Sequence, residues 1–535
     1  MKKTGNEIGY DPLDMNRYQL NLLPKKQPTK FEKYMSVVGA PIAILVFILI
    51  MFVFNIPFLH NIDASLLSKD AKAVYDAVGP EAFTAKNIAM LAIFIASLIL
   101  WITEVIPNYL TSLIVIIALV LTNVISEVDA YHQLGHQVMW LNILSFVLAS
   151  MLVRTNVARR FALWFIVKFG KNASSVFISF IVINLVLSAF ISATTAKAAI
   201  LLPIFMVVAA VYGARGGSNR NNFGRNIVLQ NLFQINIGAS AFMTGSGANL
   251  LAASLIGGAV GSQVFYADWF VVAFPISVAL LFIGWIVGTK IIFPLKPEEK
   301  VPQIAGGMDR LREELKKMGK IKFQEIKAII IFLAVLGLWV TDKWHGISPT
   351  AVAFLGAVAA LLPHIGVVKW NEVDIPWHLL MFSAGAYTLG EALSATDLAG
   401  ITVNALFNRL GLGPETPFWA LYLILTGTML FSALVFQSKT MRALLFIPIA
   451  IGIAQKFGYP VMSLAFPMAL LIEHVYVLPF NSKPAALLYV TDQYSWTDTF
   501  KFGITMMIIA WFIIILMGMT LFKWMGIIPT GVSFF

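Results

Sequence analysis

Long apolar segments constrain this chain more than any other feature of its sequence. A helix needs about 20 residues to cross the hydrocarbon core of a bilayer, and in that core every backbone polar group must be hydrogen-bonded within the protein. Eleven such segments lie near residues 37–58, 87–106, 109–126, 138–153, 225–260, 266–293, 326–341, 349–366, 377–395, 460–490 and 503–526. The sequence therefore predicts an all-α polytopic membrane protein with 11 transmembrane helices.

Composition agrees with this class and excludes others. Hydrophobic residues make up 59% of the chain and charged residues 12%, far from the soluble norm. The chain has no cysteine, which excludes disulfides and thiolate metal ligands. We interpret the net charge of +11 as basic cytoplasmic loops beside the lipid bilayer and expect no nucleic acid partner. We also expect no cofactor and no metal ion.

A polar motif occurs twice, each time near the middle of an apolar stretch of about 42 residues. It reads Ser-Ala-Thr-Thr-Ala-Lys at 192–197 and Gln-Ser-Lys-Thr-Met-Arg at 437–442, with a basic residue two places after the last threonine. Hydroxyls and cations are costly in hydrocarbon unless they face a cavity or a partner. Because a hairpin tip meets that condition, we predict re-entrant helical hairpins over about 173–214 and 415–456.

The two halves of the chain match beyond this motif. Trp-Ile-Thr-Glu at 101–104 corresponds to Trp-Val-Thr-Asp at 339–342, an offset of 339 − 101 = 238, and the motif threonines differ by 440 − 195 = 245. Five spans and a hairpin in each half, joined by one linker, must have opposite orientations because five is odd. This pattern predicts an inverted-topology repeat, the usual plan of a secondary transporter.

The predicted parts follow from this repeat. They are a cytoplasmic N-terminal tail (1–35), a first transmembrane helix outside the repeat (36–59), repeat 1 (86–293), a cytoplasmic linker (294–325) and repeat 2 (326–527). Basic residues gather in the tail, on both sides of the first hairpin and in the linker, which indicates a cytoplasmic N-terminus in the cell membrane. The span count then predicts an extracellular C-terminus.

Each hairpin precedes a span that is rich in glycine, proline, serine and asparagine at its middle, at 243–249 and 478–485. Such a run is typical of an unwound helix whose freed backbone groups face a binding site. The alternative is a packing kink with small residues at a helix interface. The candidate substrate-binding residues are Ala193, Thr194, Thr195, Thr244, Gly245, Ser246, Gly247, Asn249, Ser438, Lys439, Thr440, Asn481, Ser482 and Lys483.

These residues favour an anionic substrate. Helix N-termini at the tips and breaks present unpaired N–H groups and a positive dipole end, and Lys439 and Lys483 add positive charge. Two donor sets related by a pseudo-twofold axis suit an anion with a carboxylate at each end. The alternative for Lys439 is snorkelling, or pairing with a buried carboxylate such as Glu391 or Glu473.

The sequence resembles the divalent anion/sodium symporter (DASS) family of dicarboxylate and citrate carriers. Trp-Ile-Thr-Glu-Val-Ile-Pro at 101–107 is similar to the family's Trp-x-Thr-Glu-Ala-Ile-Pro, and both tips stand at the place of its twice-repeated Ser-Asn-Thr. The resemblance implies eleven spans, two re-entrant hairpins and a homodimer built through a scaffold domain. It also implies elevator-type alternating access, with the tips holding the carboxylates of the substrate.

Departures from the family pattern favour its sodium-independent exchangers. Ser-Asn-Thr becomes Ala-Thr-Thr at 193–195 and Ser-Lys-Thr at 438–440, and the hydroxyl residue four places before each becomes Ala189 and Leu434. Lys483 replaces a neutral residue. Because sodium is held by oxygen ligands, we predict a di- and tricarboxylate exchanger for malate, succinate, fumarate, 2-oxoglutarate and citrate.

Three other functions are alternatives to carboxylate exchange. A sodium-coupled dicarboxylate symporter is the first of them. A membrane-embedded enzyme would need convergent acid–base residues, and we expect no catalytic residue because the histidines are scattered. They are His60, His132, His136, His345, His364, His378 and His474. A channel is disfavoured because hairpins and broken helices suit occlusion rather than a continuous pore.

The predicted orientation can be tested by cysteine labelling. Single cysteines at Ser218 and Ser68 enter a chain that has none. We expect an impermeant maleimide to label the first only from the cytoplasmic side and the second only from outside. Labelling of both from one face would contradict the predicted topology.

Overall fold

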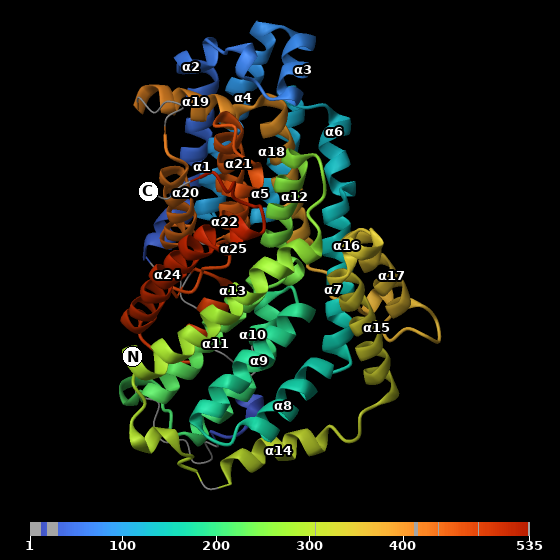
Figure 1. Ribbon diagram of the computed structural model, residues 1–535, viewed down its shortest axis with the longest axis vertical. Coiled ribbons are helices and arrows are strands. Elements are labelled where there is room, and N and C mark those ends of the chain that lie inside the picture. Colours follow the sequence, from blue (N-terminus) through green and yellow to red (C-terminus); the bar gives the residue numbers. More distant parts are fainter. Residues whose placement is uncertain are drawn as a thin grey trace.

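The fold is entirely helical in the part of the chain that the structure describes (Figure 1). A computed structural model describes residues 12–18, 30–304, 306–410, 416–436, 438–479 and 481–532. Most of the predicted tail (1–35) and Gln437 of the second motif lie outside these residues.

Twenty-five α-helices are numbered along the described chain. They are α1 (Lys30–Ile48), α2 (Pro57–His60), α3 (Lys69–Val78), α4 (Pro80–Thr103), α5 (Asn108–Leu121), α6 (Glu127–His132), α7 (Gln137–Arg154), α8 (Val157–Phe169), α9 (Ala173–Phe190), α10 (Thr194–Val211), α11 (Asn222–Ser240), α12 (Gly247–Val260), α13 (Tyr266–Ile286), α14 (Gly307–Lys317), α15 (Phe323–Val340), α16 (Asp342–His345), α17 (Pro349–Leu361), α18 (Trp377–Thr396), α19 (Leu398–Leu410), α20 (Phe418–Phe431), α21 (Lys439–Lys456), α22 (Val461–Ala469), α23 (Lys483–Tyr489), α24 (Trp496–Met519) and α25 (Leu521–Trp524).

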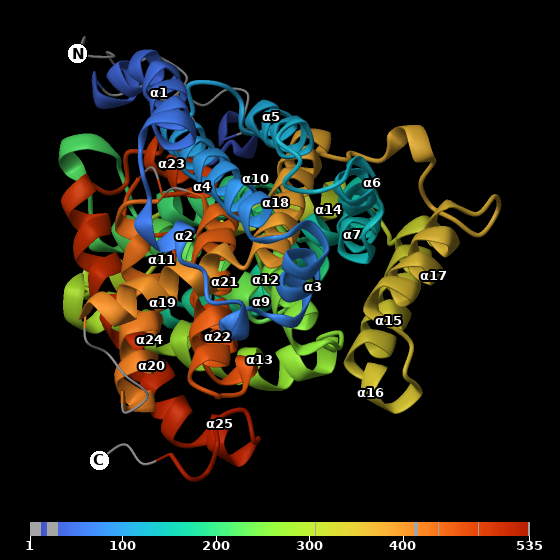
Figure 2. The same ribbon diagram turned by 90° about the horizontal axis from the view of Figure 1, so that it is seen from above.

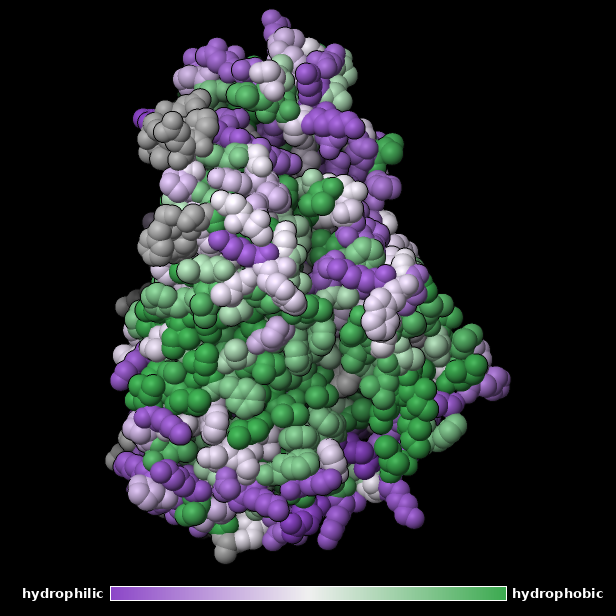
Figure 3. All heavy atoms as spheres, viewed as in Figure 1, coloured by the Kyte–Doolittle hydropathy of each residue, from purple (hydrophilic) through white to green (hydrophobic). Residues whose placement is uncertain are grey.

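The chain is a multi-span membrane protein. Six helical segments of the described chain are long and apolar enough to cross a bilayer, and they are Pro80–Thr103, Glu127–Arg154, Thr194–Val211, Tyr266–Ile292, Phe323–Val340 and Trp496–Trp524. Hydrophobic residues form a broad band around the visible face, with hydrophilic residues at both ends (Figure 3). The total of eleven spans stays a prediction, because two of the expected spans are each divided between two shorter helices.

Two of the long apolar stretches are helical hairpins. In the first, α9 and α10 are joined by residues 191–193, and in the second, α20 leads through a 3-10 turn, Ser432–Leu434, to α21. Ser438 starts α21 because its Oγ accepts a hydrogen bond from the Met441 N–H at 3.2 Å. This bond satisfies one of the donors that the first turn of a helix leaves free.

The two divided spans are α11 with α12, and α22 with α23. The return helix of each hairpin packs against the second helix of the divided span in the other half of the chain: α21 against α12, and α10 against α23. This crossed packing joins the two halves of the chain at the hairpin tips.

The remaining long helices form a second group. Helix α5 packs along α18, and α7 packs against α15 and α17. Helices α15, α16 and α17 stand to one side of the rest in both views (Figures 1 and 2). The short helices α2 and α3 lie at one end of the molecule, and α14 of the linker lies at the other (Figure 1).

Candidate functional site

The first helix break lies between α11 and α12. Asn249 stabilises this break, because its side-chain amide donates hydrogen bonds to the carbonyls of Ala239 (3.0 Å) and Phe242 (3.1 Å). Ser246 caps α12 by accepting from the Asn249 N–H at 3.3 Å. A Cβ atom on Gly245 would lie 2.1 Å from the Ala239 carbonyl oxygen, so the tight turn requires glycine.

The second helix break runs from the end of α22 to the start of α23. Asn481 Oδ1 accepts from the Leu478 N–H, and its Nδ2 donates to the Ala433 carbonyl of the second hairpin, both at 2.5 Å. Ser482 caps α23 by accepting from the Ala485 N–H at 3.3 Å. Asn481 thereby ties the break to the hairpin.

The two breaks have the same local geometry. Ser246 and Ser482, each the N-cap of the following helix, both have φ of −157°, with ψ of 157° and 160°. Their offset is 482 − 246 = 236, close to the offset of the Trp-x-Thr-acidic segments. The serine caps are therefore corresponding positions in the two halves of the chain.

A buried carboxylate joins the two breaks to the second tip. Glu473 is fully buried; its Oε1 accepts from Ser246 Oγ at 2.5 Å, and its Oε2 lies 2.5 Å from Lys439 Nζ. From the sequence, Glu473 was only one of two possible counterions and was not among the predicted site residues. The structure has the pairing alternative for Lys439, with Glu473 and not Glu391 as the partner.

The other candidate cation is Lys483. It is exposed at the start of α23 and has no ion pair or hydrogen bond with any residue that the structure describes. Its ammonium is therefore free to meet an anion, whereas that of Lys439 is already compensated.

The first tip presents oxygen atoms. Thr194 and Thr195 are half-buried at the start of α10, beside Ala193. Within the described chain their hydroxyls have no hydrogen-bond partner, and the same holds for Thr440 at the second tip. Ser192 Oγ, just before the first tip, and Asn249 Oδ1, at the first break, are buried and also have no partner among the described residues. These atoms can bind a ligand without breaking an existing bond.

Thr244, Gly245 and Gly247 complete the predicted set. Thr244 and Gly245 are buried in the 3-10 turn Met243–Gly245 of the first break, and Gly247 begins α12 half-buried. Among the described residues no group of three histidines or carboxylates could hold a metal ion.

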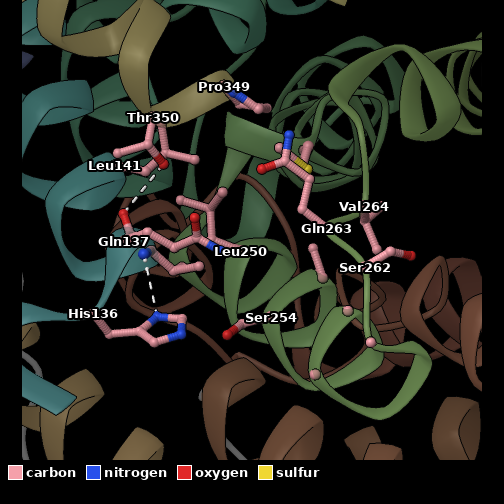
Figure 4. Close-up of a pocket in the computed structure, with 16 residues that line it drawn as sticks. His136, Gln137, Leu141, Leu250, Ser254, Ser262, Gln263, Val264, Pro349 and Thr350 are labelled. Carbon is pink, nitrogen blue, oxygen red and sulfur yellow. Dashed lines mark hydrogen bonds between the residues drawn. The ribbon is translucent and has the colours of Figure 1, made fainter. Parts of the chain in front are cut away.

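A cavity lies apart from these residues. It has a volume of about 310 Å³ and lies between α12 and the N-terminal ends of α7 and α17 (Figure 4). His136 Nδ1 accepts from the Val138 N–H at 3.3 Å, and Thr350 Oγ1 donates to the Gln137 carbonyl at 3.2 Å. None of the predicted site residues lines it, and neither does any lysine, arginine, aspartate or glutamate. A cavity with no cationic lining is a poor site for a divalent anion.

Most of the chain matches known proteins. The family model described as the sodium:sulfate symporter transmembrane region matches residues 77–528. The chain is 26% identical over 437 residues to the sodium-dependent dicarboxylate transporter SdcS of Staphylococcus saprophyticus, covering 78% of this chain and 82% of that protein. It is 25% identical over 458 residues to SdcS of Staphylococcus aureus strain NCTC 8325, covering 82% and 86%. A membrane protein of Cupriavidus necator is 23% identical over 468 residues, covering 84% and 89%.

The ion pair at the second tip gives a stability prediction. Glu473→Gln leaves the Lys439 ammonium mostly buried without its counterion, which costs about 3–5 kcal/mol of unfolding free energy. We expect a large fall in the melting temperature of the purified protein, and partial recovery when Lys439→Gln is added.

The control is Arg312→Gln, which removes an exposed ion pair with Asp309 in α14 and should cost at most about 1 kcal/mol. A Glu473→Gln variant that melts like the control would contradict the pairing.

Proposed function

Because the chain belongs to the sodium:sulfate symporter (DASS) family, whose members are transporters and not enzymes, we propose that it carries dicarboxylates across the cytoplasmic membrane by alternating access. The observation that carries this proposal is the crossed packing of α10 with α23 and of α21 with α12. In this proposal the packing would bring the two hairpin tips and the two helix breaks, with their free hydroxyls, into one region. The names of the two staphylococcal transporters support dicarboxylates as the substrate class.

The substrate would be held by the fourteen residues of the tips and breaks. The starts of α10, α12 and α21 supply backbone N–H donors and positive dipole ends. Thr194, Thr195 and Thr440 add hydroxyls, and Lys483 adds the uncompensated charge. A dicarboxylate would place one carboxylate in each repeat.

The proposal includes the membrane topology and the assembly of the protein. We propose eleven spans, two re-entrant hairpins, an inverted repeat and a homodimer built through the group of α5, α7, α15, α17 and α18. The hairpins and broken spans would move against this group as an elevator. The N-terminus would be cytoplasmic and the C-terminus extracellular, as the distribution of basic residues indicates.

Sodium-coupled symport is the better supported form of coupling. Both staphylococcal relatives carry sodium dependence in their names. Ser192 Oγ and Asn249 Oδ1 are buried oxygens without partners among the described residues, the kind of ligand that sodium requires. The Lys439–Glu473 pair also weakens the case for obligate exchange, because it leaves less uncompensated positive charge in the empty carrier.

Sodium-independent exchange of di- and tricarboxylates is the second candidate, and the second tip favours it. There the Lys439 ammonium bonds Glu473, and Leu434 offers no side-chain oxygen. A cation already tethered at this tip leaves little reason to bind another. Lys483 would then make return of the empty carrier costly, because a charge resists entry into the bilayer.

Transport in proteoliposomes tests the function and its coupling together. We expect saturable uptake of labelled succinate or malate by vesicles that contain the protein. Uptake into empty vesicles that requires sodium supports symport. Uptake that requires internal dicarboxylate, and is unchanged when potassium or choline replaces sodium, supports exchange. Absence of saturable uptake for C4 and C5 dicarboxylates under both conditions contradicts the proposal.

Threonine variants test the site. Thr195→Ala and Thr440→Ala should each raise the KM for dicarboxylates, because a lost hydroxyl leaves a carboxylate lone pair unpaired at a cost of about 1–3 kcal/mol. The matched control is Thr505→Ala on α24, whose exposed hydroxyl donates to the Lys501 carbonyl at 2.8 Å. Wild-type KM in both tip variants would refute the assignment of the hairpin tips.

A further inference from the structure

One buried basic residue in each hairpin has no part in the proposed site. Lys197 and Arg442 stand two places after the threonines of the repeated motif, in the return helices α10 and α21. Both are fully buried. A buried charge is costly unless it is paired or hydrogen-bonded, so the partners of these two cations indicate what they do.

Arg442 bonds to two segments of the second half of the chain. Its Nε donates to Ser432 Oγ at 2.9 Å and its Nη1 to the Ile472 carbonyl at 2.9 Å, while its Nη2 bonds the carbonyls of Met429 and, at 3.4 Å, Leu471. Met429 and Ser432 lie at the end of α20, and Leu471 and Ile472 lie just beyond α22. Carbonyls at a helix C-terminus lack helical partners and attract cations.

Lys197 makes the corresponding contact in the first repeat. Its Nζ donates to Ser188 Oγ on α9 at 2.7 Å and to the Ile235 carbonyl on α11 at 3.1 Å. Helices α9 and α11 approach closely here: a Cβ atom on Gly238 would lie only 2.8 Å from Ser188 Oγ.

The two contacts are related by the repeat. The basic residues differ by 442 − 197 = 245, the serines by 432 − 188 = 244, and the carbonyl residues by 472 − 235 = 237. These offsets match those of the motif threonines and of the Trp-x-Thr-acidic segments. In both repeats, therefore, a cation of the return helix joins a serine of the entry helix to a carbonyl of the broken span.

We propose that Lys197 and Arg442 are positioning residues that hold each hairpin against the first half of the broken span in its own repeat. This inference rests on the proposed function, in which the tips and breaks bind the dicarboxylate. Arg442 lies one turn beyond Lys439, and Ile472 directly precedes Glu473. The guanidinium therefore sets the spacing across which the Lys439–Glu473 pair forms. Both cations act through these neighbours and do not touch the substrate.

Arginine and lysine differ in how they can do this. A guanidinium has five donors in a planar fork and reaches several acceptors at once, whereas an ammonium has three donors on one nitrogen. Arg442→Lys keeps the charge and loses part of the bonding. Arg442→Met loses both, and Ser432→Ala removes a single acceptor.

Transport kinetics and hydrogen exchange of full-length variants test the proposal. For Arg442→Met we expect the KM for succinate and for 2-oxoglutarate to rise together by roughly 10- to 100-fold, with a smaller fall in maximal rate per folded carrier. Arg442→Lys should recover part of the loss, and Ser432→Ala should raise the KM by a few fold. Lys197→Met and Ser188→Ala should act in parallel. The control is Lys501→Met, an exposed lysine on α24.

Amide exchange without substrate separates this inference from the proposed function. Arg442→Met, or Arg442→Lys if the former does not fold, should speed exchange at 432–436 and 470–479 more than at 188–195, and Lys197→Met should do the reverse. If amide hydrogen exchange is unchanged in these variants, the inference is overturned, whatever substrate the protein transports. It is also overturned if KM is unchanged and only the yield of folded protein falls, or if selectivity shifts toward monocarboxylates, which would make Arg442 a direct ligand. If the wild-type protein transports no dicarboxylate but amide hydrogen exchange in the variants changes as expected, only the proposed function is refuted.

Discussion

The structure depends on how the backbone is hydrogen-bonded where its helices are interrupted. In apolar surroundings a freed N–H or carbonyl group has no water to bond, and an unmade bond costs several kcal/mol. Asn249 meets this need at the first break and Asn481 at the second, with serine caps on the helices that follow. Arg442 bonds the carbonyls at two further helix ends. The polar residues of the breaks are therefore first a condition for folding, and only then a means of binding.

Charge is distributed unequally between the two halves. Near the hairpin tips and breaks, the second half holds Arg442, the Lys439–Glu473 pair and the exposed Lys483, whereas the first half holds Lys197 and neutral oxygens. A dicarboxylate bound as proposed would meet one mainly cationic half and one half of hydroxyls and amides. The two halves thus share the backbone geometry of their breaks while they carry different chemistry.

Glu473 links the halves because it accepts from Ser246 of the first break as well as pairing with Lys439 of the second tip. Such a pair gains little net stability over an apolar contact, but removal of one partner is costly. Its effect is to couple the positions of three segments, so that a shift in one changes the others. That coupling suits elements that are proposed to move together across a membrane.

The sequence by itself determined the helical membrane class, the two polar motifs and the two helix breaks, because hydropathy and the Gly, Pro, Ser and Asn content are local properties. For Lys439 it offered pairing with a buried carboxylate only as an alternative to binding the substrate. Only the tertiary structure decided between Glu391 and Glu473, since the partner lies 34 residues away and is brought close by the packing of α21 on α22. The same holds for Lys197 and Arg442, whose carbonyl partners outside their own hairpins lie 38 and about 30 residues away. The sequence alone also could not predict the crossed packing of each hairpin on the opposite broken span. That packing depends on contacts between distant segments and not on the chemistry of either segment.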